Sequence, residues 1–347
     1  MAAAVALAAL LALALAAAPA QATAYQGLNY FQVKGGVAVT IAKKSVKSVT
    51  VPAKIDGKKV VACYLDDYDE AKGAYKQIKL KKVNLKDATN LKKLYMHGTK
   101  VTSLDLSSCK NLTVVLCEGN TKLKTLKFGT HKKLMDLNCY GCNIKKLDLS
   151  KCPNLKNVMC GSNSKLATLK LGTHKKLTSL GCSACAIKKL NVTKCPKLKT
   201  LYCTYNKLTS LNVKKNTKLT RLDCDRNKLT KLDVSKNTKL ATLCCHENKL
   251  TSLNLSKNTK LTYVGCALNR LTSLTLPTTS TLVQVACEHN KLTTLDLRGC
   301  PKVSDLACES NGLTAILLSA NHVKFTKLSY AYGNNIADAS GIEALRA

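Results

Sequence analysis

Cysteine is the residue type in this sequence whose number and spacing could most readily carry chemistry. The 347 residues include eighteen cysteines, and many cysteines in a secreted chain normally indicate disulfides. Two C-x-x-C pairs, Cys139/Cys142 and Cys182/Cys185, also have a spacing found in zinc sites. Disulfides, a structural zinc ion and thiol redox chemistry are therefore the alternatives to be weighed.

Ten of the cysteines recur at intervals of 21 or 22 residues, and this spacing argues against disulfides, a zinc site and thiol redox chemistry. They are Cys117, Cys139, Cys160, Cys182, Cys203, Cys224, Cys245, Cys266, Cys287 and Cys308. Side chains stacked in register have parallel Cβ vectors, which suit a disulfide poorly, whereas a buried cysteine packs as a small apolar side chain. The two C-x-x-C pairs lie two repeats apart, about 10 Å at the spacing of stacked strands, so four thiolates cannot meet on one zinc ion. We expect cysteines that fill a core, with no metal site and no cofactor.

Other candidates for chemistry are few. The six histidines are scattered, and His131 and His174 occupy equivalent turn positions of the repeat. The acidic cluster Asp66–Glu70 could suggest a calcium loop, but its spacing is not that of an EF-hand, and a solvated loop is the favoured interpretation. The sequence contains no G-x-S-x-G segment, no P-loop and no paired-carboxylate signature. We therefore expect that the protein is not an enzyme.

A repeat of 21 residues must position these side chains. The asparagines that mark it most clearly are Asn206, Asn227, Asn248, Asn269, Asn290 and Asn311, each 21 residues from the next. A fixed period of this length indicates a protein built of stacked coils. A single coil buries only about five apolar side chains, worth about 8–15 kcal/mol, while ordering its backbone costs more than about 20 kcal/mol. Stacking is therefore what makes the coils stable.

Each coil is predicted to contain two short strands. In the coil that begins at Asn206, apolar and polar residues alternate at Leu211–Val213 and again at Leu222–Cys224. The second stretch puts its leucine and its cysteine in the core, and Arg221 and Asp223 on the opposite face. The predicted fold is therefore mainly β, a solenoid with two short parallel strands in each coil of about 21 residues.

The sequence divides into four predicted segments. Residues 1–22 are uncharged, rich in alanine and leucine and end in an A-x-A-like site, which predicts a secretory signal peptide; an uncleaved membrane anchor is the alternative. Residues 23–79 depart from the repeat and predict a β-rich N-terminal cap over the open edge of the first coil. About 12 coils follow in residues 80–335, and a C-terminal cap in 336–347 with a short helix at 341–346. No segment after the signal is long and apolar enough to span a bilayer.

The second half of the coil carries a resemblance to a known family. Residues 219–229 and their copies match L-x-x-L-x-C-x-x-N-x-L, the leucine-rich repeat consensus, and the chain resembles the secreted internalin-like and BspA-like repeat proteins of bacteria. Residues 25–30 and 49–57 resemble the N-terminal part of the BspA-like group. The resemblance implies a secreted or surface-exposed protein that binds host or neighbouring-cell molecules, with the second strand lining the concave side. The cysteine and lysine contents depart from the family.

Positive charge is the strongest feature of the composition. Lysine and arginine number 55 against 20 acidic residues, a formal net charge of +35, which predicts attraction to anionic partners. The lysines form columns beside the turns, among them Lys207, Lys218, Lys228, Lys239, Lys249 and Lys260. These columns could be solvated edges, since like charges about 5 Å apart repel by less than about 1 kcal/mol in water, or they could bind wall polymers, mucin or nucleic acid. Specific recognition of nucleic acid is not expected, because the columns lack regular aromatic side chains for stacking.

The outward positions of the second strand vary from coil to coil and carry almost no lysine. Their mixture of tyrosine, methionine, leucine, histidine and acids is typical of a recognition surface, with neutral drift as the alternative. The residues expected to bind a partner are Tyr95, Leu116, Tyr140, Met159, Tyr202, Arg221, Asp223, His246 and Tyr263.

The favoured function is a non-catalytic, adhesin-like binding protein, secreted or on the cell surface and monomeric. It would recognise a protein or glycan of a host or neighbouring cell through the variable strand positions. The alternatives are a polycation that adheres to anionic polymers through its lysine columns, and a structural spacer that presents other domains.

Overall fold

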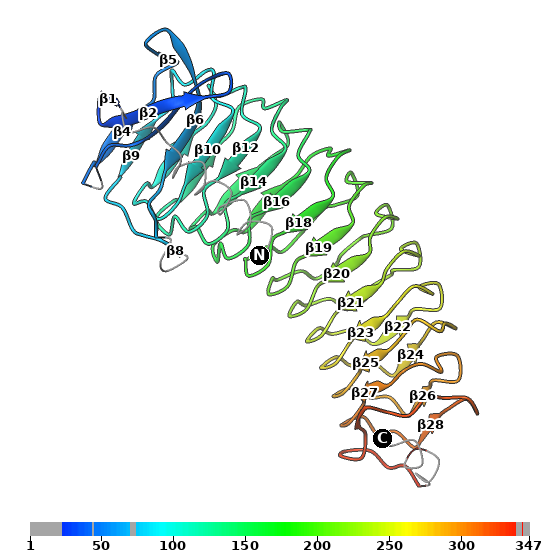
Figure 1. Ribbon diagram of the computed structural model, residues 1–347. Coiled ribbons are helices and arrows are strands. Elements are labelled where there is room, and N and C mark those ends of the chain that lie inside the picture. The colour runs from blue at the N-terminus through cyan, green and yellow to red at the C-terminus, as the bar shows by residue number, and fades with distance from the viewer. Residues whose placement is uncertain (1–22, 44, 70–73, 338–341, 343–347) are drawn as a thin grey trace. The chain divides into compact units, whose positions relative to one another are not determined.

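In the computed structural model, the described residues are 23–43, 45–69, 74–337 and 342 (Figure 1). They belong to two compact units, Met1–Gly172 and Thr173–Ala347. Two predicted segments lie outside the described residues: the signal peptide, and the closing helix except for Ile342. Glu70 of the acidic cluster also lies outside them. Among the described residues, no helix is both long and apolar enough to pass through a bilayer.

The first unit begins with strands longer than those of the repeat. Strands β2 (Leu28–Val33) and β3 (Gly36–Ile41) form an antiparallel hairpin, β3 pairs in parallel with β6 (Lys58–Leu65), and β6 pairs in parallel with β10 (Lys93–Met96). The shorter strands of this region are β1 (Thr23–Tyr25), β4 (Ser48–Thr50), β5 (Lys54–Ile55), β7 (Tyr68–Asp69) and β8 (Ala74–Tyr75). Because β6 continues the sheet of the repeats, its side chains share a face with theirs.

From β10 onward, each coil of the first unit adds one strand to a parallel sheet. These strands are β12 (Val114–Leu116), β14 (Asp136–Asn138) and β16 (Asn157–Met159), each paired with the next. The first strands of the coils form separate parallel pairs, β4 with β9 (Lys82–Asn84), β11 (Ser103–Asp105) with β13 (Thr125–Lys127) and β15 (Lys146–Asp148) with β17 (Thr168–Lys170). The predicted solenoid with two parallel strands per coil is thereby confirmed.

The second unit repeats this arrangement (Figure 1). Its second strands, in order of pairing, are β18 (Ser179–Gly181), β19 (Thr200–Tyr202), β20 (Arg221–Asp223), β21 (Thr242–Cys244), β23 (Tyr263–Gly265), β25 (Gln284–Ala286), β27 (Asp305–Ala307) and β29 (Lys327–Ser329). Its first strands pair as β22 (Ser252–Asn254) with β24 (Ser273–Thr275) and β26 (Thr294–Asp296) with β28 (Ala315–Leu317). Within the second unit, the parallel sheet is thus the surface that its coils share.

Three coils of the second unit depart from the prediction of two strands. Residues 189–191, 210–212 and 231–233 are extended between turns but form no strand. There the coils are joined by single backbone hydrogen bonds, such as Lys207 N–H to the Ile187 carbonyl at 2.9 Å and Lys228 N–H to the Leu208 carbonyl at 2.8 Å. A strand needs the repeated pairing of a ladder, so one bond per coil leaves this side irregular.

The repeated asparagines satisfy the backbone inside each turn. Asn227 is 8% exposed, its Nδ2 donates to the carbonyls of Cys203 at 3.0 Å and Cys224 at 3.1 Å, and its Oδ1 accepts from Leu208 N–H at 3.0 Å. One side chain therefore pairs backbone groups of two successive coils that would otherwise be buried without partners. This explains why asparagine marks the period.

The cysteines fill the core beside these asparagines, as predicted. All eighteen are buried, and the column that includes Cys203, Cys224 and Cys245 is 0% exposed. Burial raises the pKa of the Cys266 thiol to about 12, so the thiolate that reacts with oxidants and metals is scarce. The cysteines of this column therefore act as packing residues.

Candidate functional site

The outward face of the parallel sheet in the first unit carries four of the residues predicted to bind a partner. Tyr140 and Met159 are well exposed, at 48% and 37%, and Leu116 in β12 is half-buried. Tyr95 in β10 is only 4% exposed and stacks on Tyr64 of β6 with 4.9 Å between ring centroids. The expectation that Tyr95 is an exposed contact residue is therefore wrong, because a strand from outside the repeat supplies a neighbouring ring.

A buried histidine beside Tyr95 holds two carboxylates. His97 is 1% exposed, with Nδ1 3.0 Å from Asp66 Oδ2 and Nε2 3.0 Å from Glu118 Oε1. Burial by itself lowers the pKa of His97, but the two acids outweigh it and raise this pKa to about 9. Asp66 follows β6 and Glu118 follows β12, so the imidazolium clamps three neighbouring strands. The interpretation of Asp66 as part of a solvated loop is wrong for this residue.

In the second unit, three of the predicted residues form one contact network. Arg221 Nη2 lies 3.1 Å from Asp223 Oδ2, and its guanidinium carbon lies 5.5 Å from the centre of the Tyr202 ring. Arg221 thus bridges an acid on its own strand, β20, and an aromatic ring on β19. A planar guanidinium held between a carboxylate and a ring presents a fixed surface, which suits recognition.

His246 and Tyr263 form a second network on the same face. His246 Nε2 lies 3.1 Å from Tyr263 Oη, and the backbone N–H of Ala267 donates to His246 Nδ1 at 3.1 Å. An accepting Nδ1 fixes the neutral tautomer that carries hydrogen on Nε2, so both ring nitrogens are occupied and neither can act as a general base. Burial is the main cause that raises the pKa of Tyr263 to about 12, which keeps its hydroxyl neutral.

Gly265 makes the contact between His246 and Tyr263 possible. A Cβ atom at Gly265 would overlap both His246 Nε2 and Tyr263 Oη. We expect Gly265→Ala to displace the imidazole and to lower the free energy of unfolding by about 1–3 kcal/mol, the usual cost of overpacking. Urea unfolding of the variant measures this loss. In Gly265→Ala with His246→Ala, the overlap with the imidazole is gone and Tyr263 Oη can shift into the space it leaves, so the double variant should be about as stable as His246→Ala alone; a further loss equal to that of Gly265→Ala would mean that the ring contact is not the cause.

Residues of the turn that follows the second strand line a hollow that the sequence analysis did not identify. It has a volume of about 380 Å³ and is lined by Thr204, Tyr205, Asp223, Asp225, Arg226, His246, Glu247, Ala267, Leu268 and Glu288. Tyr205 and Leu268 are 52% and 48% exposed, and both have left-handed backbone angles, φ of 52° and 54°. Of the predicted residues, Asp223 and His246 contribute to this hollow, which we call the anchor hollow.

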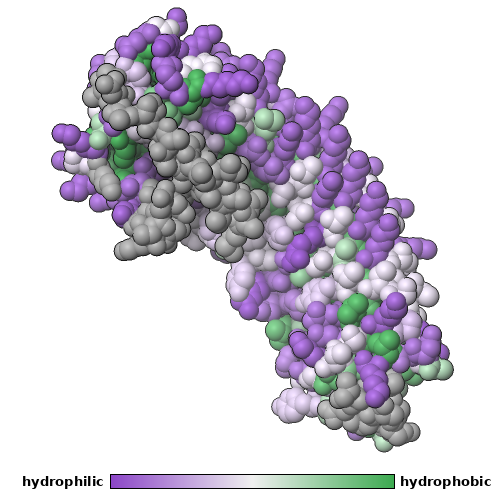
Figure 2. All heavy atoms as spheres, viewed as in Figure 1, coloured by the Kyte–Doolittle hydropathy of each residue, from purple (hydrophilic) through white to green (hydrophobic). Residues whose placement is uncertain are grey.

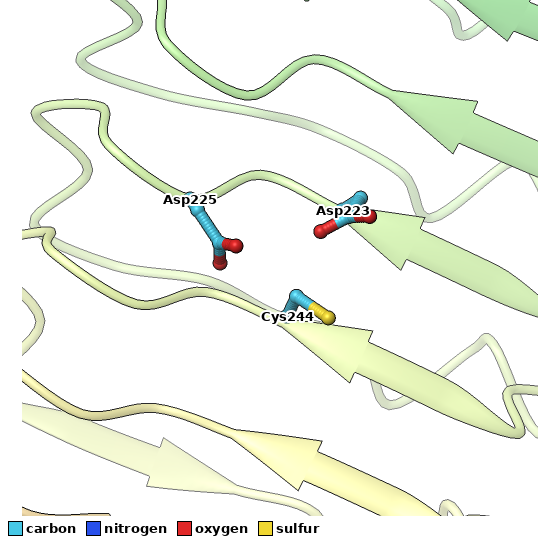
Figure 3. Close-up of side chains that lie close together, drawn as sticks. All are labelled: Asp223, Asp225 and Cys244. Atoms are coloured by element: carbon cyan, nitrogen blue, oxygen red, sulfur yellow. The ribbon is translucent and has the colours of Figure 1, made fainter. Parts of the chain in front are cut away.

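One group at the edge of the anchor hollow has the composition of a metal site. One ligand atom each from Asp223, Asp225 and Cys244 lie within 4.8 Å of one another, and the three side chains converge from β20, its following turn and β21 (Figure 3). However, Asp223 already pairs with Arg221 and Asp225 Oδ1 accepts the His246 N–H at 2.8 Å. Burial and the two aspartates also raise the pKa of Cys244, so its thiol is protonated, and we assign no metal to this group.

The predicted lysine columns lie apart from these networks. Figure 2 shows hydrophilic side chains in rows along the turns at one edge of the molecule. The six lysines named for binding anionic polymers are all exposed: Lys207, Lys218, Lys228, Lys239, Lys249 and Lys260. They lie in or beside turns, whereas Arg221 and His246 belong to the strand face.

Comparison with known proteins places the fold. No protein-family model matches the sequence, and no curated protein matches it. Among solved structures, the functional domain of InlJ from Listeria monocytogenes, which includes a cysteine ladder, is 29% identical with a TM-score of 0.51. The match covers 66% of this chain and 60% of that domain, so this chain spans less than two thirds of the InlJ structure.

Two further structures agree in fold at lower identity. YopM, a leucine-rich effector protein from Yersinia pestis, is 20% identical with a TM-score of 0.53, over 76% of this chain and 80% of YopM. The LRIM1/APL1C complex gives 18% identity and a TM-score of 0.55, over 85% of this chain and 56% of that one. The parallel sheet, the period of 21 residues, the buried cysteine column and the likeness to InlJ lead to one conclusion: the chain has a leucine-rich repeat fold that is similar to that of the InlJ domain.

Proposed function

We propose that this protein is a non-catalytic, adhesin-like binding protein, secreted or on the cell surface. It recognises a protein or glycan of another cell or of a host matrix through the outward side chains of its second strands. One observation carries the proposal: in the second unit, Arg221 is held between Tyr202 and Asp223, and His246 is fixed against Tyr263. Immobile aromatic and arginine side chains are the groups that dominate binding energy at interfaces.

The surroundings of these side chains support binding rather than catalysis. The nitrogens of His246 are engaged by Ala267 and Tyr263, and burial keeps the nearby Cys244 thiol protonated. Both groups are thus unsuited to act as a base or a nucleophile. The matched LRIM1/APL1C structure is itself a complex, which fits a fold used for binding. We further propose the division into a signal peptide at 1–22, an N-terminal cap at 23–79, coils at 80–335 and a C-terminal cap at 336–347.

An array experiment with two charge-matched variants tests the proposal. The full chain is applied to glycans and extracellular-matrix proteins, first at low ionic strength and then at about 1 M salt, where screening limits charge attraction to about 3 Å. We expect binding that survives salt, and an Arg221→Glu variant weaker on the order of tenfold or more, since arginine is a frequent hot-spot residue. Lys207→Glu makes the same change of charge at an exposed position beside a turn and should bind as the wild type does.

The opposite pattern would support the polycation alternative. If all binding disappears at high salt, and Lys207→Glu weakens it as much as Arg221→Glu does, then the lysine columns hold the ligand and the strand face does not. Circular dichroism of both variants checks that the fold is retained.

A further inference from the structure

The anchor hollow is lined mainly by acidic side chains, whereas the chain as a whole carries a large positive charge. Four carboxylates line it, those of Asp223, Asp225, Glu247 and Glu288, against the single guanidinium of Arg226. This occurs on a chain with a formal net charge of +35. Arg226 is already engaged, because its Nε lies 2.5 Å from Glu247 Oε1. The hollow is therefore an acidic site in a basic protein, and its own arginine does not neutralise it.

Among the described residues, no lysine or arginine pairs with two of the carboxylates of the hollow, those of Asp225 and Glu288. Glu288 Oε2 is buried without a hydrogen bond, and Asp225 Oδ1 accepts only the backbone N–H of His246. A buried acceptor that lacks a partner costs about 1–3 kcal/mol, more if it is charged. Burial also raises the pKa of Asp225, because the ionised carboxylate is poorly solvated there. A bound cation would remove this penalty.

Buried and exposed residues both line the hollow. Ala267 is 2% exposed, and the ring of His246 is held in place by Tyr263. On the rim, the Arg226 guanidinium stacks on Tyr205 with 4.4 Å from its carbon to the ring centre, and the Leu268 N–H donates to the Glu288 carbonyl at 3.0 Å. The exposed carbons of tyrosine and leucine thus lie at the entrance to an acidic interior.

We propose that the anchor hollow receives a lysine or arginine side chain of a protein partner. The aliphatic stem would contact Tyr205 and Leu268, while the charged end would reach Asp225 and Glu288. Long cationic side chains have this division into an apolar stem and a charged head, and charge complementarity of this kind gives specificity. The inference rests on the proposed function and narrows it, because an acidic hollow favours a basic protein segment over a neutral or anionic glycan.

Blocked amino acids are suitable probes for the hollow. Nα-acetyl-arginine methylamide and the uncharged, nearly isosteric Nα-acetyl-citrulline methylamide are titrated into the isotope-labelled full chain. Backbone amide shifts of Ala267, Leu268 and Glu288 are followed by NMR. We expect the arginine derivative to bind with a Kd on the order of 1 mM and the citrulline derivative to bind at least about tenfold more weakly, a difference of about 1.4 kcal/mol. Equal shifts with both derivatives would overturn the proposal, and this comparison needs no variant.

A matched pair of variants separates the hollow from general charge effects. Asp225→Asn with Glu288→Gln neutralises two carboxylates inside it, and Asp233→Asn with Asp296→Asn neutralises two exposed ones elsewhere in the second unit. We expect the first variant to lose arginine binding about tenfold and the second to retain it; equal losses would contradict a specific site. If the same amides shift when the unliganded protein is concentrated, the occupant is a lysine of a second copy, and the assignment to a different protein is overturned.

The array experiment keeps the two proposals apart. If arginine shows no preference for the hollow while Arg221→Glu still abolishes array binding, the recognition face stands and this inference fails. If the arginine derivative prefers the hollow but Arg221→Glu leaves binding to the array unchanged, the anchor hollow stands and the recognition face fails.

Discussion

Replacing Asn248 by leucine is expected to lower the free energy of unfolding by about 3–5 kcal/mol, because several buried backbone groups lose their partners at about 1–3 kcal/mol each. Asn248 is 8% exposed. Its Nδ2 donates to the carbonyls of Cys224 at 3.0 Å and His246 at 3.1 Å, and its Oδ1 accepts from Leu229 N–H at 3.0 Å. Leucine has a similar volume but satisfies none of these groups.

Urea unfolding of Asn248→Leu measures the loss, and the same substitution at an exposed asparagine serves as the control. Asn254 lies in β22, is exposed, and its Oδ1 accepts only the Ser256 N–H at 3.0 Å. Asn254→Leu should cost less than about 1 kcal/mol, in the range of surface substitutions. If the two variants lose similar stability, the asparagine column is not what joins the coils. Because stability in a stacked repeat depends on contacts between neighbours, Asn269→Leu in the next coil should behave like Asn248→Leu.

The repeat could be predicted from sequence because its rules are local. An interval of 21 residues between asparagines, and alternation such as that of Leu222 and Cys224 with Arg221 and Asp223, are enough to assign inward and outward positions. The structure agrees, with Leu222 and Cys224 fully buried and the other two half-buried. The cysteine column followed from the same reasoning, since each coil offers one small apolar position at the same place.

The features that sequence reasoning missed depend on contacts across the chain. Tyr95 is buried because Tyr64, in a strand that does not belong to the repeat, pairs beside it. The anchor hollow does not follow from the repeat pattern, because Tyr205 and Leu268 occupy a left-handed turn position that is typical of connecting segments. In neighbouring coils that position holds Arg226, Glu247 and His289. Such diversity at one left-handed turn position is the signal in the sequence that could indicate the anchor hollow.

Glycine 265 illustrates a further limit. In the sequence it is one member of a strand position that elsewhere holds Tyr202, Asp223, Cys244 and Ala286, which suggests drift. In the folded chain, the absence of a Cβ atom there lets His246 reach Tyr263. The side chain that matters belongs to the neighbouring strand, so no pattern within one coil could indicate it.

The contact of His97 with Asp66 and Glu118 in the first unit should make the free energy of unfolding decrease at alkaline pH. The folded-state pKa of His97 is raised from 6.5 to about 9, so the imidazolium is favoured in the folded state. Its contribution is fully present below pH about 6.5 and is lost as pH rises through about 9. A shift of this size corresponds to about 3 kcal/mol. The sign is opposite to that of a salt-bridged aspartate, whose contribution is lost in acid.

His97→Gln is the variant that isolates this effect. Glutamine cannot carry charge, so Asp66 and Glu118 lose their shared cation, and removing one partner of a buried charged group costs about 3–5 kcal/mol. We expect the difference in unfolding free energy between wild type and His97→Gln to be largest at or below pH 6.5 and to shrink by about 3 kcal/mol by pH 10. His289→Gln, at an exposed position, should cost less than about 1 kcal/mol at every pH. A His97 ring that titrates near pH 6.5 by NMR, or a difference that is constant with pH, would show that the two acids do not hold an imidazolium between them.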